Sequence, residues 1–142
     1  MAIYSLSQNT TVTTTGAAAM DLKASSANSP KIMEVALNLL TGTASTYGLG
    51  RSGNAPTQTS PVLVQAENPA DPAGQSGSAV AWSVAPTVPA QFFRRVSLPP
   101  TVGAGVIWTF PRGLTLAASA AMLIWNLATN SASMNAWWVV DE

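Results

Sequence analysis

The chain has 142 residues and no net charge, and only 8% of its residues are charged, against about 25% in an ordinary soluble domain. It contains neither Cys nor His, which excludes disulfides, thiolate and imidazole metal ligands, and Ser-His-Asp or Cys-His catalysis. Its few basic residues form no cluster of the kind that binds nucleic acid, so we expect a structural or binding protein rather than an enzyme, with no cofactor and no metal.

The N-terminal segment, residues 3–15, is polar and rich in β-branched residues. Because it has too few large apolar residues to bury a face alone, we predict that residues 1–18 form an extended arm, either mobile or paired with a neighbour's sheet. A single β-sandwich domain would then span residues 19–142. We expect no signal peptide, because the first residues lack a basic region and an apolar core. Three side chains of the arm are candidate interface residues: Tyr4, Leu6 and Val12.

Apolar and polar residues alternate from Lys31 to Leu40, with Val35 and Leu37 on one face. Period two with one apolar face predicts a half-buried strand, and the short length favours it over a helix. Residues 43–51 are predicted as the next strand. Gly48 and Gly50 share a face there, which indicates that another backbone or chain lies close.

Further strands are predicted between turns rich in Pro and Gly. They cover residues 61–67, 78–85, 91–98 and 105–110, and a long turn-rich loop covers residues 68–77. In the second of these strands, the alternation places three apolar side chains on one face: Val80, Trp82 and Val84.

The stretch from Leu114 to Ala128 is apolar-rich, but polar residues interrupt it and it is shorter than the roughly 20 residues of a membrane helix. A helical stripe through Leu116, Leu123 and Leu127 is a real alternative there, and we favour two strands around a turn. A last strand is predicted over residues 135–141. Eight or nine short strands indicate an all-β antiparallel β-sandwich, jelly-roll-like, with no membrane segment.

Three arrangements that could carry chemistry give weak signals. The acids show no paired spacing suited to hydrolysis or to calcium, so we expect them to be solvated or salt-bridged. Residues 48–53 spell GxGxxG, but no helix follows, so no dinucleotide site is expected. The acids in question are Asp21, Glu34, Glu67, Asp71, Asp141 and Glu142.

The five tryptophans divide into two groups. Trp82, Trp108 and Trp125 adjoin aliphatic residues in predicted strands, so we expect them in the core. Trp137 and Trp138 are neighbours and must point to opposite faces of a strand. One of them leaves the core, and we favour packing against another subunit over a platform for sugar stacking.

Arg94 and Arg95 also follow one another on a predicted strand. One of them should point inward or toward a neighbour, and a buried charge needs a partner, such as Glu34, Glu67 or a group across a subunit interface. Alternatively, the strand lies at a sheet edge and both charged ends reach water.

Residues 92–99, 105–114 and 123–127, with the segment from Val35 to Arg51, resemble small all-β proteins of tailed phages and prophages. The resemblance covers about residues 31–142 and is closest to head decoration (cement) proteins. It implies a virion structural protein, commonly a trimeric jelly roll, and carries no catalytic residues over. The chain departs from the pattern at residues 117–121, which lack the expected turn glycine.

We therefore expect a capsid decoration protein, made in the host cytoplasm and located on the phage particle. Its partners would be further copies of itself, with a trimer favoured, and a major capsid protein or another virion protein. The alternative is a carbohydrate- or receptor-binding module of a phage fibre or tail. The candidate contact residues outside the arm are Arg94, Arg95, Trp137 and Trp138.

Overall fold

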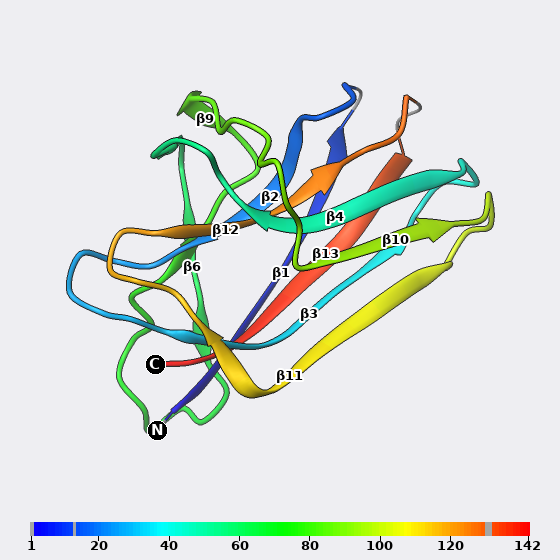
Figure 1. Cartoon of the computed structure of the whole chain (residues 1–142). Helices are drawn as coiled ribbons and strands as arrows, with labels where there is room; N and C mark the ends of the chain where they lie inside the picture. The colour runs from blue at the N-terminus through cyan, green and yellow to red at the C-terminus, as the bar shows by residue number, and fades with distance from the viewer. Residues whose placement is uncertain (1, 13, 130–131) are drawn as a thin grey trace.

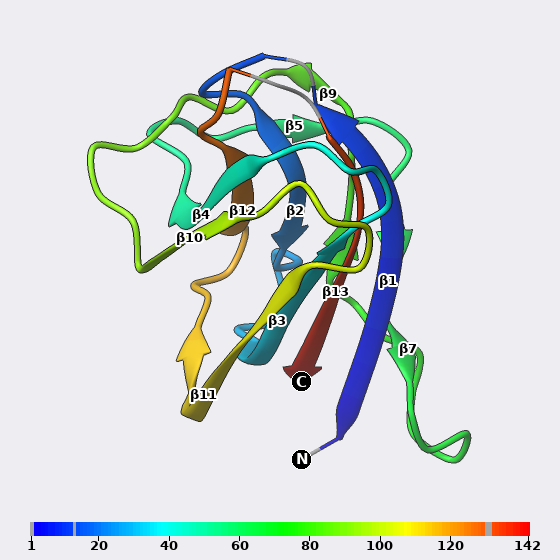
Figure 2. The ribbon, with the colours of Figure 1, turned by 90° about the vertical axis from the view of Figure 1, so that its right-hand side faces the viewer.

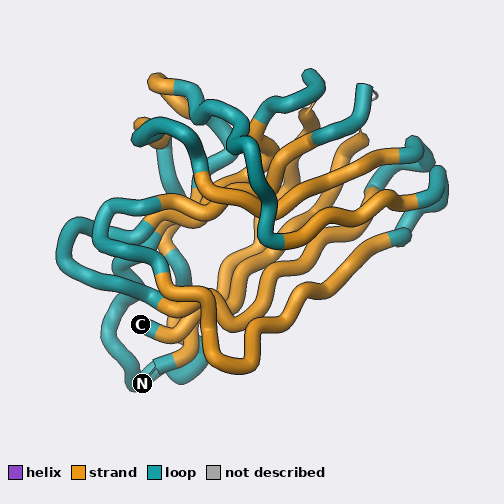
Figure 3. The backbone as a smooth tube through the Cα atoms, viewed as in Figure 1, coloured by secondary structure: helices purple, strands orange, loops and turns teal. Residues whose placement is uncertain are grey.

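Two antiparallel sheets pack face to face in the computed structural model, which describes residues 2–12, 14–129 and 132–142 (Figure 1). The described residues contain strands and loops and no helix (Figure 3). The predicted antiparallel β-sandwich is therefore confirmed.

Sheet A has five strands and sheet B has six. In spatial order, sheet A contains β11 (Gly105–Thr115), β3 (Lys31–Leu39), β13 (Ala132–Asp141), β1 (Ile3–Val12) and β7 (Gln65–Ala66). Sheet B contains β10 (Arg94–Leu98), β4 (Ser45–Arg51), β12 (Ala121–Asn126), β2 (Ala18–Lys23), β8 (Gly77–Ser78) and β6 (Val62–Leu63). Outside both sheets, β5 (Thr57–Gln58) pairs with β9 (Trp82–Val84).

The pairing of the longer strands follows the jelly-roll pattern. When the short strands of residues 52–93 are set aside, the first strand pairs with the last, the second with the second last, and so on inward: β1 with β13, β2 with β12, β3 with β11, and β4 with β10. Successive pairs alternate between the two sheets. The chain is thus a long antiparallel ribbon rolled up on itself, the arrangement of a jelly roll.

The expectation of an N-terminal arm is wrong for the described residues of that segment. Strand β1 lies inside sheet A, paired with β13 from Ile3 to Val12 and with β7 on its other side. Tyr4 and Leu6 are buried in the same chain's core. Residues 1 and 13 of the expected arm lie outside the described residues.

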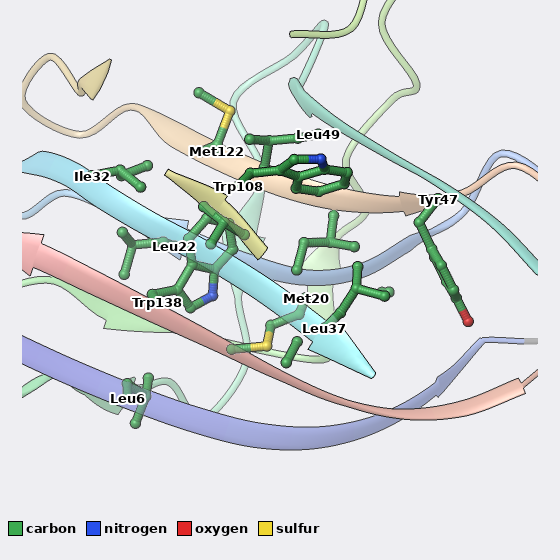
Figure 4. Packing of buried hydrophobic residues seen from close by; sticks show 14 of the residues in the cluster. Leu6, Met20, Leu22, Ile32, Leu37, Tyr47, Leu49, Trp108, Met122 and Trp138 are labelled. Atoms are coloured by element: carbon green, nitrogen blue, oxygen red, sulfur yellow. The ribbon is translucent and has the colours of Figure 1, made fainter. Parts of the chain in front are cut away.

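Alternation along the strands fills the space between the sheets. On β13, Met134, Ala136, Trp138 and Val140 are buried, and the residues between them are partly exposed on the outer face of sheet A. Figure 4 shows Trp138 among aliphatic side chains of both sheets. The predicted half-buried strands that became β3 and β11 are confirmed.

Residues 114–128 form the end of β11, a turn and β12, as favoured over a helix. In this turn Ser119 adopts a positive φ of 62°, a conformation that glycine takes most readily. Every residue of β12 is buried, because Leu123 and Trp125 form a second apolar cluster with Trp82 and Phe92 on the outer side of sheet B.

The close approach expected at Gly48 is confirmed, and the approaching group is a side chain of the same chain. A Cβ atom added at Gly48 would lie 2.7 Å from Cδ1 of Phe92. Residues 85–93 thus cross the outer face of sheet B, and the two glycines of β4 leave room for the Phe92 ring.

The strands predicted over residues 61–67 and 78–85 are only partly correct. They break into the short strands β6, β7, β8 and β9, within a long connection from β4 to β10 that we call the excursion, residues 52–93. Val80 and Val84 are exposed and Trp82 is partly buried, so the apolar face predicted for residues 78–85 does not pack between the two sheets.

Candidate functional site

The described residues contain no group of three or more Asp and Glu side chains that could hold a metal ion. Within the same residues, no helix is long and apolar enough to cross a membrane. The candidate site must therefore be sought among surfaces and hollows.

Asp21 on β2 is fully buried, contrary to the expectation that the acids are solvated or salt-bridged. Its carboxylate accepts hydrogen bonds from Gln58 Nε2 and the Ala79 backbone N–H at 2.7 Å each, and from Trp82 Nε1 at 2.8 Å. Burial raises its pKa, and these hydrogen bonds oppose the rise. All three donors belong to the excursion, so Asp21 fastens that segment to sheet B and acts as a structural group.

The outer face of sheet A carries few charges, and the strand register sets its pattern. One row across the sheet consists of Ser7, Trp137, Ala36 and Ile107, contributed by β1, β13, β3 and β11. The next row toward the turn between β3 and β4 contains three asparagines and a glycine: Asn9, Asn135, Asn38 and Gly105.

Trp137 is the aromatic residue that the sequence required to leave the core. Its side chain is partly exposed, whereas Trp138 is fully buried. The Trp137 Nε1–H donates a hydrogen bond of 2.9 Å to Glu34 Oε1 on the neighbouring strand. Ala36 beside it is fully buried although it points outward, so the indole lies low over the middle of the sheet.

A shallow hollow of about 480 Å³ opens beside Trp137, lined also by Ser5, Leu6, Ser7 and Gln65. Its lining residues come from β13, β1 and β7. Strands β1 and β7 lie at the opposite edge of the sheet from β11 (Figure 2). Sequence reasoning missed the serines, because the segment that carries them was taken as an arm. The alternation of serine with apolar residues at the start of β1 was the available signal.

Three of the candidate interface residues are buried inside the sandwich. Tyr4 is 4% exposed, Leu6 9% and Trp138 0%, and all three belong to the main core cluster. Their side chains stabilise this chain and are unavailable to a partner. Val12, at the end of β1, is partly buried against the same cluster.

Arg94 and Arg95 lie on β10, an edge strand of sheet B, and both are exposed. Neither expected carboxylate partner contacts them. The Arg94 guanidinium lies 5.4 Å from the ring centre of Phe110, and that of Arg95 lies 4.8 Å from the ring centre of Phe92. The alternative of an edge strand with both charges in water is the one that the structure bears out.

Three exposed apolar side chains lie on β11, on the loop before it and just after β3. Ile107 is 58% exposed, Val102 66% and Leu40 37%. Hydrogen bonds from Gly103 N to Leu39 O and from Leu39 N to Ala104 O, 2.8 Å each, hold the loop before β11 against the end of β3. We call these three side chains the β11 strip. One edge of β11 pairs with β3, and no strand of the described residues pairs with its other edge, so backbone groups there are left without a strand partner.

A scan against models of known protein families and a search of curated proteins found no match to this chain.

Proposed function

We propose that this chain is a non-enzymatic virion structural protein, a decoration (cement) protein that stabilises a capsid shell. It would act as a homo-oligomer, with a trimer as the favoured state, seated on a major capsid protein. The exposed apolar β11 strip, on a molecule with 8% charged residues, is the observation that supports this proposal.

The occupant of the β11 strip in this proposal is a neighbouring shell subunit. These large apolar side chains are 37–66% exposed. A partner that removes them from water stabilises the complex, because burial of apolar surface is favourable. The free edge of β11 can add backbone hydrogen bonds to an extended segment of that neighbour. Strand β1, expected earlier to make such a contact, pairs with β13 along its length and with β7 at Tyr4 and Ser5.

Co-sedimentation with purified capsids that lack the protein tests the proposal. Ile107→Lys should weaken attachment about tenfold or more, because a charge replaces the apolar contact. Val84→Lys is the matched control, since Val84 is 48% exposed but lies on the excursion. Circular dichroism would establish that both variants fold. Absence of co-sedimentation, or equal binding of the two variants, would refute the proposal.

A further inference from the structure

The hollow beside Trp137 results from the sizes of outward-facing side chains on three adjacent strands. Ser7 on β1 lies opposite Trp137 on β13, and Ser5 lies opposite Gln65 on β7. Adjacent strands are about 4.8 Å apart, so small side chains on the middle strand leave a trough about 10 Å wide between the larger ones. The volume of about 480 Å³ falls in the range of small-molecule sites.

One wall of this trough is a fixed aromatic surface. The hydrogen bond from Trp137 Nε1 to Glu34 Oε1 restrains the indole, and the outward methyl of Ala36 supports it from the neighbouring strand. A ligand that stacks on this ring therefore orders little of the protein, which favours binding. Donation of the N–H to a carboxylate also makes the ring face more electron-rich, and so more attractive to C–H groups that carry partial positive charge.

Apart from Leu6, the rest of the lining consists of neutral groups that both donate and accept hydrogen bonds: the hydroxyls of Ser5 and Ser7 and the amide of Gln65. The Glu34 carboxylate, which accepts the Trp137 hydrogen bond, puts a negative charge beside the indole. An anionic ligand would be repelled there. The lining thus suits a neutral molecule with an apolar C–H face and a rim of hydroxyls.

We propose that this hollow binds a neutral hexopyranose unit of a glycan. The C–H face of the sugar ring stacks on Trp137, and its hydroxyls bond with Ser5, Ser7 and Gln65. The proposal does not depend on capsid decoration, because the trough lies at β1 and β7 and the β11 strip lies at the other edge of the sheet. Attachment to a capsid and attachment to a glycan can therefore succeed or fail separately.

The test combines a glycan array with titration of ¹⁵N-labelled protein, using neutral hexose oligosaccharides such as cello-, malto- and mannohexaose. We expect neutral glycans to bind and to shift the Trp137 indole N–H resonance. Trp137→Ala should weaken binding about tenfold or more, and Trp137→Phe should weaken it less, because stacking on an aromatic ring carries much of the affinity. Ser7→Ala and Gln65→Ala should each reduce it several-fold.

Val84→Ala is the control, since Val84 is 48% exposed but lies on β9, outside sheet A and outside both proposed contact surfaces. Its binding should equal that of the unaltered protein. The proposal is overturned if no neutral glycan binds at about 10 mM, a concentration at which even weak sugar sites are occupied. It is also overturned if Trp137→Ala binds normally, or if only anionic glycans or a proline-rich peptide shift the indole resonance.

Discussion

Two fully buried tryptophans differ by one hydrogen bond. Trp125 Nε1 donates to the Gly50 carbonyl at 3.0 Å, whereas Trp138 Nε1 has no acceptor among the described residues. Trp→Phe leaves a similar void at either site, but only at Trp125 does it remove a satisfied donor. We expect Trp125→Phe to lower the free energy of unfolding by about 1 kcal/mol more than Trp138→Phe. Urea denaturation of both variants measures the difference, and equal losses would contradict it.

Asp21 makes stability depend on pH in an unusual direction for an acid. Burial raises its folded-state pKa above the ordinary value of 3.8, so the folded state holds the proton more tightly than the unfolded state. The free energy of unfolding therefore falls as pH rises from about 3.8 through the folded-state pKa. Asp21→Asn removes this dependence. We expect the unfolding free energy of the native chain, minus that of the variant, to fall as pH rises through this window.

Urea titrations at several pH values give that difference, in which the contributions of the other acids cancel. The amide that replaces the carboxylate in the variant can accept from Gln58 and Ala79, but it places an N–H₂ group toward Trp82 Nε1. The absolute stabilities of the two proteins will therefore differ, and the pH slope is the informative quantity. A difference that is independent of pH would show that Asp21 is not buried as described.

At the scale of elements, the structure reverses the expectation for the N-terminus. Strand β1 provides a ten-residue ladder with β13 and two core side chains, Tyr4 and Leu6. Burial of such side chains contributes about 1.5–3 kcal/mol each, against a total stability of about 5–15 kcal/mol for a domain. Deletion of residues 2–12 should therefore abolish cooperative thermal unfolding, as measured by circular dichroism. The double variant Ser5→Ala, Ser7→Ala should retain it, and a cooperatively folded truncation would restore the arm interpretation.

Period-two patterns identified the strands whose inward positions are large and apolar, such as β3 and β13. The pattern did not identify β1 as a core strand, because Thr10 occupies one of its inward positions. There the Thr10 Oγ1 donates a hydrogen bond to the Ala19 carbonyl at 2.9 Å. A buried threonine with a backbone acceptor looks the same in sequence as an exposed one. The strands of the excursion were predicted too long, because they are two or three residues each. Hydrogen bonds to the Asp21 carboxylate and a few apolar side chains, such as Val64 and Phe92, hold this segment without a periodic pattern.

One part of the candidate site was predictable from the alternation of side chains along a strand. Neighbouring positions required Trp137 and Trp138 to face opposite ways, and alternation with Met134 and Val140 could have assigned Trp138 to the core. The trough beside Trp137 was not predictable. It requires β1, with Ser5 and Ser7, to lie between β13, with Trp137, and β7, with Gln65. The jelly-roll connection of distant segments brings these three strands together.

At the scale of the whole molecule, sparse charge makes a specific prediction about attachment. With a net charge of zero and six basic residues spread along the chain, a docked subunit would be held by apolar and backbone contacts, which salt screens little. We expect capsid attachment to change less than about threefold between roughly 50 mM and 500 mM NaCl, whereas a contact dominated by ion pairs would weaken steeply over that range. Sodium sulfate should strengthen attachment, because it favours burial of apolar surface. Capsid co-sedimentation across both salt series measures this, and release of the protein by moderate NaCl would show that charged groups hold it instead.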